Sequence, residues 1–86
     1  MSAKVEIYTK DWCPYCARAQ QLLAECGVEA VEHKIDMGGA KRAEMIQRAA
    51  GRTTVPQIFI DDRHVGGCDD LFELHRSGQL ADMLAA

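Results

Sequence analysis

The sequence predicts an α/β fold in which a four-stranded mixed sheet is flanked by helices, in the order strand–helix–strand–helix–strand–strand–helix. Three observations support this prediction. Short runs alternate between apolar and polar residues, longer segments carry apolar residues at helical spacing, and glycine or proline separates the segments. A strand–helix–strand start implies a parallel pair with a right-handed crossover, and two later strands joined by a short polar turn add an antiparallel hairpin.

The first strand and the first helix are separated by a short turn. Residues 5–9 alternate in polarity and predict a strand. A helix is expected from Pro14, because proline suits a first helical position where its missing N–H has no partner, and Gly27 is a natural C-cap. Its buried face is expected to comprise Ala17, Leu22, Leu23 and Cys26. Free cysteines are among the most buried residues, so Cys26 is expected in the core.

A second strand and a second helix are expected next. Residues 31–35 alternate, with Val31 and His33 on the apolar side of the strand. Two glycines at positions 38–39 then break the chain before a helix that Gly51 closes. The inward-facing residues of this helix are expected to be Ala43, Ile46, Ala49 and Ala50.

The remaining residues predict a hairpin and a third helix. Residues 57–60 and 63–65 read as two short strands around the polar turn Asp61-Asp62. Two glycines lead into a helix, and a Ser-Gly pair interrupts it before a short apolar tail. This helix is expected to place Leu71, Phe72 and His75 in the core or at its boundary. The whole order is that of a thioredoxin-like fold.

Length and charge restrict the function. With 86 residues the chain has room for one domain, expected over residues 1–86. A net charge of −3 gives no basic patch of the kind that a nucleic-acid-binding protein needs. No apolar run approaches the roughly 18 residues of a membrane span, and the first residues leave no room for a signal peptide. We therefore expect a soluble, cytoplasmic monomer that binds neither nucleic acid nor membrane.

Two of the four cysteines form the candidate catalytic pair. Cys13 and Cys16 lie three positions apart at the expected start of a helix, which puts their Cβ atoms about 5–6 Å apart on one face. A small adjustment brings them to the roughly 3.8 Å of a disulfide. The helix N-terminus stabilises an anion, so Cys13 is the expected nucleophile and Cys16 the resolving thiol. Structural zinc usually needs two close ligand pairs, and the absence of a second pair favours redox chemistry.

Three blocks of the sequence resemble the glutaredoxin family. The first is residues 7–16, which read IYTKDWCPYC; the second is residues 53–59, which read TTVPQIF; the third is residues 66–70, which read GGCDD. In combination they are similar to small bacterial dithiol glutaredoxins of the CPYC type. The resemblance implies a glutathione-dependent disulfide oxidoreductase with a redox-active Cys13–Cys16 disulfide. Glutathione would be a co-substrate, with no tightly bound cofactor and no metal.

The resemblance also implies a glutathione groove. Its expected residues are Lys10, Tyr15, Arg52, Thr54, Val55, Pro56, Gly67, Cys68, Asp69 and Asp70. Val55 would precede a cis bond to Pro56 and pair with glutathione like an added strand. The helix start at residues 68–70 would hold the γ-glutamyl end, and Lys10 or Arg52 the glycyl carboxylate. The thiol of Cys68 is either made more acidic by the helix start or is simply a small group packed near the site.

The resemblance further implies partners, and two alternative functions remain open. Glutathionylated proteins would be substrates, ribonucleotide reductase a client, and glutathione reductase with NADPH the source of reduced glutathione. One alternative is a glutaredoxin-like donor reduced by thioredoxin reductase, which would need no block like residues 66–70. The other is an iron–sulfur carrier that uses Cys13 and glutathione as ligands, a role that Pro14 disfavours.

Overall fold

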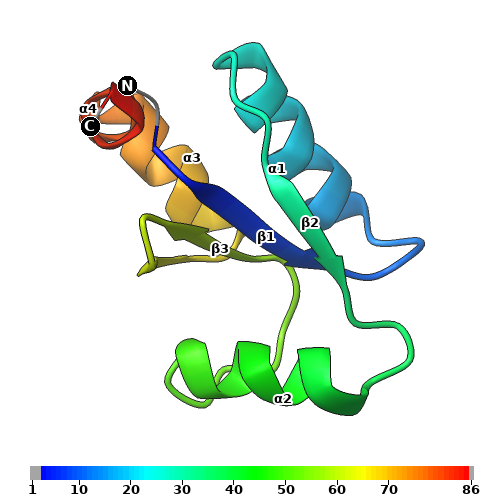
Figure 1. Ribbon diagram of the computed structural model, residues 1–86. Helices are drawn as coiled ribbons and strands as arrows, with labels where there is room; N and C mark the ends of the chain where they lie inside the picture. Colours follow the sequence, from blue (N-terminus) through cyan, green and yellow to red (C-terminus); the bar gives the residue numbers. More distant parts are fainter. Residues whose placement is uncertain (1–2, 86) are drawn as a thin grey trace.

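Residues 3–85 are described by the computed structural model, and they contain a four-stranded sheet with the strand order β2-β1-β3-β4 (Figure 1). The strands are β1 (Val5–Thr9), β2 (Val31–Lys34), β3 (Gln57–Ile60) and β4 (Arg63–Gly66). Strand β1 is parallel to β2 and antiparallel to β3, and β3 is antiparallel to β4. The predicted mixed sheet and the thioredoxin-like fold class are confirmed.

Helices cover both faces of the sheet. Helices α1 (Pro14–Glu25), α3 (Cys68–Arg76) and α4 (Gln79–Ala85) lie on one face, and α2 (Gly39–Arg48) lies alone on the other (Figure 1). Helix α4 forms where the sequence predicted only an apolar tail, because Leu80 is buried against the main core. No helix among residues 3–85 has the length and apolar composition needed to cross a membrane.

The core on the α1 and α3 face is aliphatic. Alternate residues of each strand point to the same face of a sheet, so Val5 and Ile7 of β1 lie beside Ile58 and Ile60 of β3. The helices add Ala19, Leu22, Leu23, Cys68, Leu71 and Leu80 to this cluster. Burying such side chains contributes roughly 1.5–3 kcal/mol each and fixes the start of α1 and α3 against the sheet.

The opposite face of β1 is also buried, although its residues look polar in sequence. Tyr8 packs with Phe59 and Met45 in a second cluster under α2. The Arg48 guanidinium donates to both carboxylate oxygens of Glu6, at 3.1 and 2.9 Å, and to the Tyr8 hydroxyl at 2.7 Å. Residue Arg48 therefore ties α2 to β1 through charged hydrogen bonds as well as through apolar contact.

Two predicted helix faces are partly wrong. In α1 the buried positions begin at Cys16 and continue through Ala19, so Ala17 lies one step around the helix and is exposed. Cys26 is exposed rather than in the core, because α1 ends at Glu25 and Cys26 is its C-cap. Because Cys26 lies after the last helical residue, the helical spacing of the buried residues of α1 does not extend to it.

The second helix and the edge strand differ from prediction in a similar way. Ala43 and Ala50 are exposed, and Met45 fills the space under the sheet that they were expected to fill. Val31 is 53% exposed at the start of β2, which is an edge strand of the sheet. His75 is exposed on α3 rather than at the core boundary.

Candidate active site

The two predicted catalytic cysteines lie at the N-terminus of α1. Cys13 is the N-cap residue with extended backbone, and Pro14 occupies the first helical position. The Cys13 sulfur accepts a hydrogen bond from the Cys16 backbone N–H at 3.1 Å. Both cysteines are free thiols in this structure. A helix N-terminus presents unpaired N–H groups to its cap residue, so a thiolate at Cys13 is stabilised by the helix itself.

Cys16 has a contrasting environment. Its side chain is only 2% exposed, whereas Cys13 is half-buried at the surface. Burial, assisted by the hydrogen bond and the charge of Cys13, raises the pKa of the Cys16 thiol to about 12. The structure therefore separates an accessible sulfur at the helix start from a protonated thiol one turn inside.

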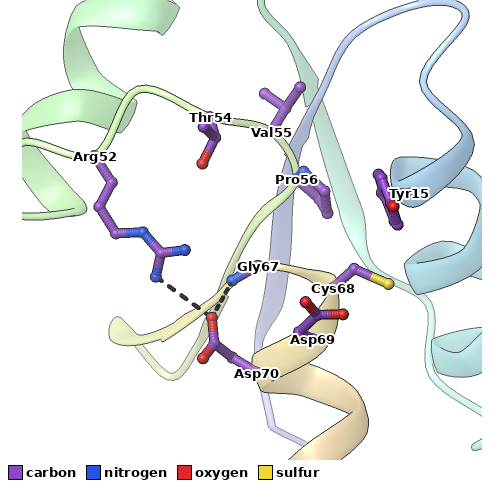
Figure 2. A pocket seen from close by; sticks show the side chains of 9 residues that line it. All are labelled: Tyr15, Arg52, Thr54, Val55, Pro56, Gly67, Cys68, Asp69 and Asp70. Atoms are coloured by element: carbon purple, nitrogen blue, oxygen red, sulfur yellow. Dashed lines mark hydrogen bonds and ion pairs between the residues drawn. The ribbon is translucent and has the colours of Figure 1, made fainter.

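A cavity of about 340 Å³ lies beside this pair, between the start of α1, the loop before β3 and the start of α3 (Figure 2). Its lining residues are Tyr15, Arg52, Thr54, Val55, Pro56, Gly67, Cys68, Asp69 and Asp70. These are nine of the ten residues predicted for the groove. Tyr15 approaches from α1, while Arg52 reaches in from the opposite side (Figure 2). The Val55–Pro56 bond is cis, as the resemblance implied.

The tenth residue, Lys10, lies elsewhere. It lines a second cavity of about 450 Å³ together with Cys13 and Cys16. Trp12 borders the same cavity, is 99% exposed and has a left-handed backbone with φ of 59°. Cys13 thus borders a second cavity, and Lys10 does not line the predicted groove.

The start of α3 is organised around Asp70. One of its carboxylate oxygens accepts the Gly67 backbone N–H at 2.8 Å and lies 3.4 Å from the Arg52 guanidinium (Figure 2). Gly66 has φ of 119°, and a Cβ at this position would come within 2.3 Å of that same oxygen. Asp69 is exposed beside the cavity and makes no side-chain hydrogen bond to any residue in the range 3–85.

The interpretation of Cys68 as an acidified thiol is wrong. Cys68 is buried in the aliphatic core, and this burial raises the pKa of its thiol. Desolvation is the largest cause, since Cys68 is only 7% exposed. The remaining interpretation, a small residue packed against the site, agrees with the structure.

Two residues near the groove were not singled out from the sequence. Gln57 is fully buried at the start of β3, and His64 on β4 contacts its side chain. The sequence could have indicated Gln57, because it is a polar residue directly after Pro56 at the start of a strand of apolar residues. Among residues 3–85, no three His, Cys, Asp or Glu side chains lie close enough together to hold a metal ion.

The fold and the asymmetric dithiol define a thioredoxin-like thiol–disulfide oxidoreductase. The glutaredoxin family model matches residues 5–65. Glutaredoxin 3 of Escherichia coli strain K12 is 60% identical over 82 residues, covering 95% of this chain and 98% of that protein. Glutaredoxin of Pseudomonas aeruginosa is 55% identical over 82 residues, covering 95% and 96%.

Solved structures agree with the sequence comparisons. The solution structure of glutaredoxin from Brucella melitensis superimposes with a TM-score of 0.83 at 51% identity, covering 96% of this chain and 89% of that one. The crystal structure of a buckwheat glutaredoxin–glutathione complex gives 0.86 at 34% identity, covering 96% and 77%. The chain belongs to the glutaredoxin family, and its activity is that of a glutathione-dependent disulfide oxidoreductase.

Proposed function

We propose that the chain acts as one domain that reduces protein–glutathione mixed disulfides and protein disulfides, with Cys13 as nucleophile and Cys16 as resolving thiol. The observation that carries this proposal is the asymmetry of the pair. Cys13 is at the helix start and reachable, whereas Cys16 is 2% exposed with a raised pKa. Exchange proceeds through attack of a thiolate on a disulfide sulfur, so the accessible, helix-stabilised sulfur attacks first.

For a mixed disulfide, the Cys13 thiolate attacks the sulfur of the glutathionyl group. A Cys13–glutathione disulfide forms, and the protein leaves as a thiolate that takes a proton from solvent. A second glutathione, as thiolate, attacks the glutathione sulfur of the adduct. Oxidised glutathione forms, and Cys13 leaves again as thiolate. Glutathione reductase and NADPH would then restore reduced glutathione.

For a protein disulfide, Cys13 forms a mixed disulfide with one protein sulfur and releases the other as thiolate. Cys16 then loses its proton and attacks the Cys13 sulfur, which releases the second protein thiolate. Two of the causes that raise the Cys16 pKa, the hydrogen bond and the charge of Cys13, disappear once the Cys13 sulfur is bonded to the substrate. The resolving thiol therefore becomes more acidic when it is needed, and two glutathiones reopen the ring.

The groove beside Cys13 would hold the glutathione. Asp69 is exposed at the start of α3 with a carboxylate free to meet the glutathione ammonium, and the first N–H groups of α3 suit its carboxylate. Tyr15 offers an apolar wall with a polar tip. The buckwheat glutaredoxin of similar structure was solved as a complex with glutathione, which supports glutathione as the ligand. The physiological substrates would be glutathionylated proteins, with ribonucleotide reductase as a candidate client.

Two variants test this proposal with a glutathionylated peptide and a disulfide-containing protein as substrates, in the presence of glutathione, glutathione reductase and NADPH. Cys13→Ser should abolish both activities, because a serine hydroxyl is not ionised at neutral pH. Cys16→Ser should lose most of its reduction of the protein disulfide and keep deglutathionylation, where glutathione replaces the resolving thiol. The exposed Cys26 provides the matched control, Cys26→Ser, which should behave as the unmodified protein. Equal loss of deglutathionylation in both active-site variants would contradict the assigned roles.

A further inference from the structure

Gln57 directs its amide toward the segment that lines the groove. Its side chain is 0% exposed, and its nitrogen donates to the Thr54 backbone carbonyl at 3.0 Å and to the Thr54 hydroxyl at 3.2 Å. Its oxygen lies 2.6 Å from Nε2 of His64. Within residues 3–85, both of the side-chain hydrogen bonds that Thr54 accepts come from Gln57.

The chemistry of these groups fixes the direction of every bond. A carbonyl can only accept, so the Gln57 nitrogen must face Thr54 and the Gln57 oxygen must face His64. Nε2 of His64 must therefore carry a proton, whether the ring is neutral or charged. Removing this donor would leave the amide held only at its nitrogen, by Thr54. His64 is thus the second anchor that keeps Gln57 in its orientation.

His64 is itself held in place. Its ring stacks on Phe59, with centroids 5.0 Å apart and planes at 27°. Phe59 is buried in the core under α2, and the Arg48 guanidinium lies 4.1 Å from its ring centroid. The ring that carries the donor for Gln57 therefore packs against a buried aromatic residue, although His64 is itself exposed on the edge strand β4.

The effect on the groove follows from peptide geometry. The Thr54–Val55 peptide bond is trans, and in a trans peptide the C=O and the following N–H point in opposite directions. Gln57 pulls the Thr54 carbonyl inward toward a buried amide. The Val55 N–H therefore points in the opposite direction, away from Gln57. A peptide that pairs with Val55 like an added strand needs that N–H in this direction.

We propose that Gln57 and His64 are positioning residues that aim the Val55 N–H at the backbone of the thiol substrate, and so give the enzyme its preference for glutathione over simple thiols. This inference rests on the proposed role of the groove. Neither residue touches the reacting sulfurs. The expected consequence of losing either one is a loss of selectivity among thiols, with the intrinsic reactivity of Cys13 retained.

The test compares two mixed disulfides of one peptide, one formed with glutathione and one formed with 2-mercaptoethanol. The glutathionyl group has a backbone that can pair with Val55 when Cys13 attacks its sulfur, whereas the 2-mercaptoethanol group has none. The measured quantity is the ratio of kcat/KM for the glutathione disulfide to kcat/KM for the 2-mercaptoethanol disulfide, at one fixed concentration of reduced glutathione. Losing one well-aimed hydrogen bond of about 1.4 kcal/mol lowers this ratio about tenfold. The rate with the 2-mercaptoethanol disulfide serves as an internal measure of folding and of Cys13 reactivity.

Two variants and a matched control make the test specific. Gln57→Leu removes the donor to Thr54, and His64→Phe keeps the stack on Phe59 but removes the proton that orients Gln57. His33 is the control, because its ring also lies against a core aromatic, Tyr8, with centroids 4.8 Å apart, and it also pairs with a strand side chain, but that side chain is Glu6 and not Gln57. His33→Phe should keep the unmodified ratio.

The outcomes separate this proposal from the one on which it rests. A ratio that falls in both Gln57→Leu and His64→Phe, and not in His33→Phe, supports the positioning role. If Gln57→Leu does not fold, His64→Phe decides, because its ring stays stacked. A glutathione preference that survives in His64→Phe overturns this proposal alone. An unmodified protein with no preference for glutathione would overturn the groove assignment together with it.

Discussion

Glu6→Gln should destabilise the protein through the contact that joins α2 to β1. Glu6 and Arg48 keep only 14% and 23% of their side-chain exposure, and the guanidinium binds both carboxylate oxygens. This hydrogen bonding, opposed by burial and assisted by His33, lowers the pKa of Glu6 from 4.5 to about 2. Glutamine keeps the shape and removes the charge, so the change isolates the electrostatic part of the contact.

The magnitude follows from the pKa of Glu6. A lowering of this size corresponds to roughly 3 kcal/mol of stability at neutral pH, and solvent screening of the partly exposed pair reduces it to about 2 kcal/mol. For a small domain with a urea slope of about 1 kcal/mol per M, the unfolding midpoint of Glu6→Gln should fall by roughly 2 M at pH 7. Glu25→Gln is the control, since Glu25 is exposed and its carboxylate contacts only Gln21 among residues 3–85.

The pH dependence gives the stricter test. Because the pKa of Glu6 is lower in the folded protein, its contribution is fully present above about pH 4.5 and is lost as pH falls toward 2. The stability gap between the unmodified protein and Glu6→Gln should be constant from pH 7 to about 5, and less than half of it should remain at pH 3. An equal gap at pH 7 and pH 3, or no gap at pH 7, would refute the electrostatic account.

Two further predictions concern the start of α3 and the cysteines outside the active site. Gly66→Ala should lower the free energy of unfolding by about 1–3 kcal/mol, because φ is 119° and the added Cβ would lie 2.3 Å from the Asp70 carboxylate oxygen; an unchanged urea midpoint would contradict this. In a Cys13→Ser, Cys16→Ser background, iodoacetamide should modify Cys26 well before Cys68, because Cys26 is exposed while Cys68 is buried with a raised pKa. Mass spectrometry that finds equal rates at the two thiols would contradict the burial of Cys68.

Local patterns were sufficient to predict the order of the elements from β1 to α3 and the position of the dithiol, but not α4. Pro14 after Cys13 marks the helix start that makes the pair asymmetric, and this inference needs no knowledge of distant contacts. Nine of the ten predicted groove residues also meet in one cavity, because they lie at the ends of elements that the sheet order brings together. Lys10 could not be placed in this way, since it lies on the turn before α1, whose direction is set by tertiary contacts.

The errors have a common physical cause. Ala17, Ala43 and Ala50 are small and fit almost any position of a helix, so periodicity alone does not fix which side they occupy. Met45 reaches the core from a position where an alanine could not. Cys26 was predicted to be buried because free cysteines usually are. It is instead the C-cap of α1, and a C-cap lies beyond the buried face of its helix whatever residue occupies it.

Glu6 and Tyr8 show why the polar half of this fold was hard to infer. A strand that alternates apolar and polar residues usually has one face in water. In β1, however, α2 covers the second face, which carries Glu6 and Tyr8. Arg48 neutralises the Glu6 carboxylate and donates a hydrogen bond to the Tyr8 hydroxyl. The acidic, aromatic and basic members of this cluster are distant in sequence, so each by itself resembles a surface residue. Both faces of β1 are buried because helices cover both sides of the sheet, with one apolar cluster on each side.

The same reasoning explains why the supports of the groove escape a search for chemical motifs. The groups expected to meet the substrate at Val55 are backbone groups, which any residue could supply. What is specific to this sequence is the buried amide of Gln57 behind them and the His64 ring that orients it. Phe59 links that ring to the Arg48 cluster, so the electrostatic contact that stabilises α2 and the hydrogen bonds that aim the loop share one buried aromatic residue. In a chain of 86 residues, the support of the binding segment and the stability of the fold therefore depend on the same few side chains.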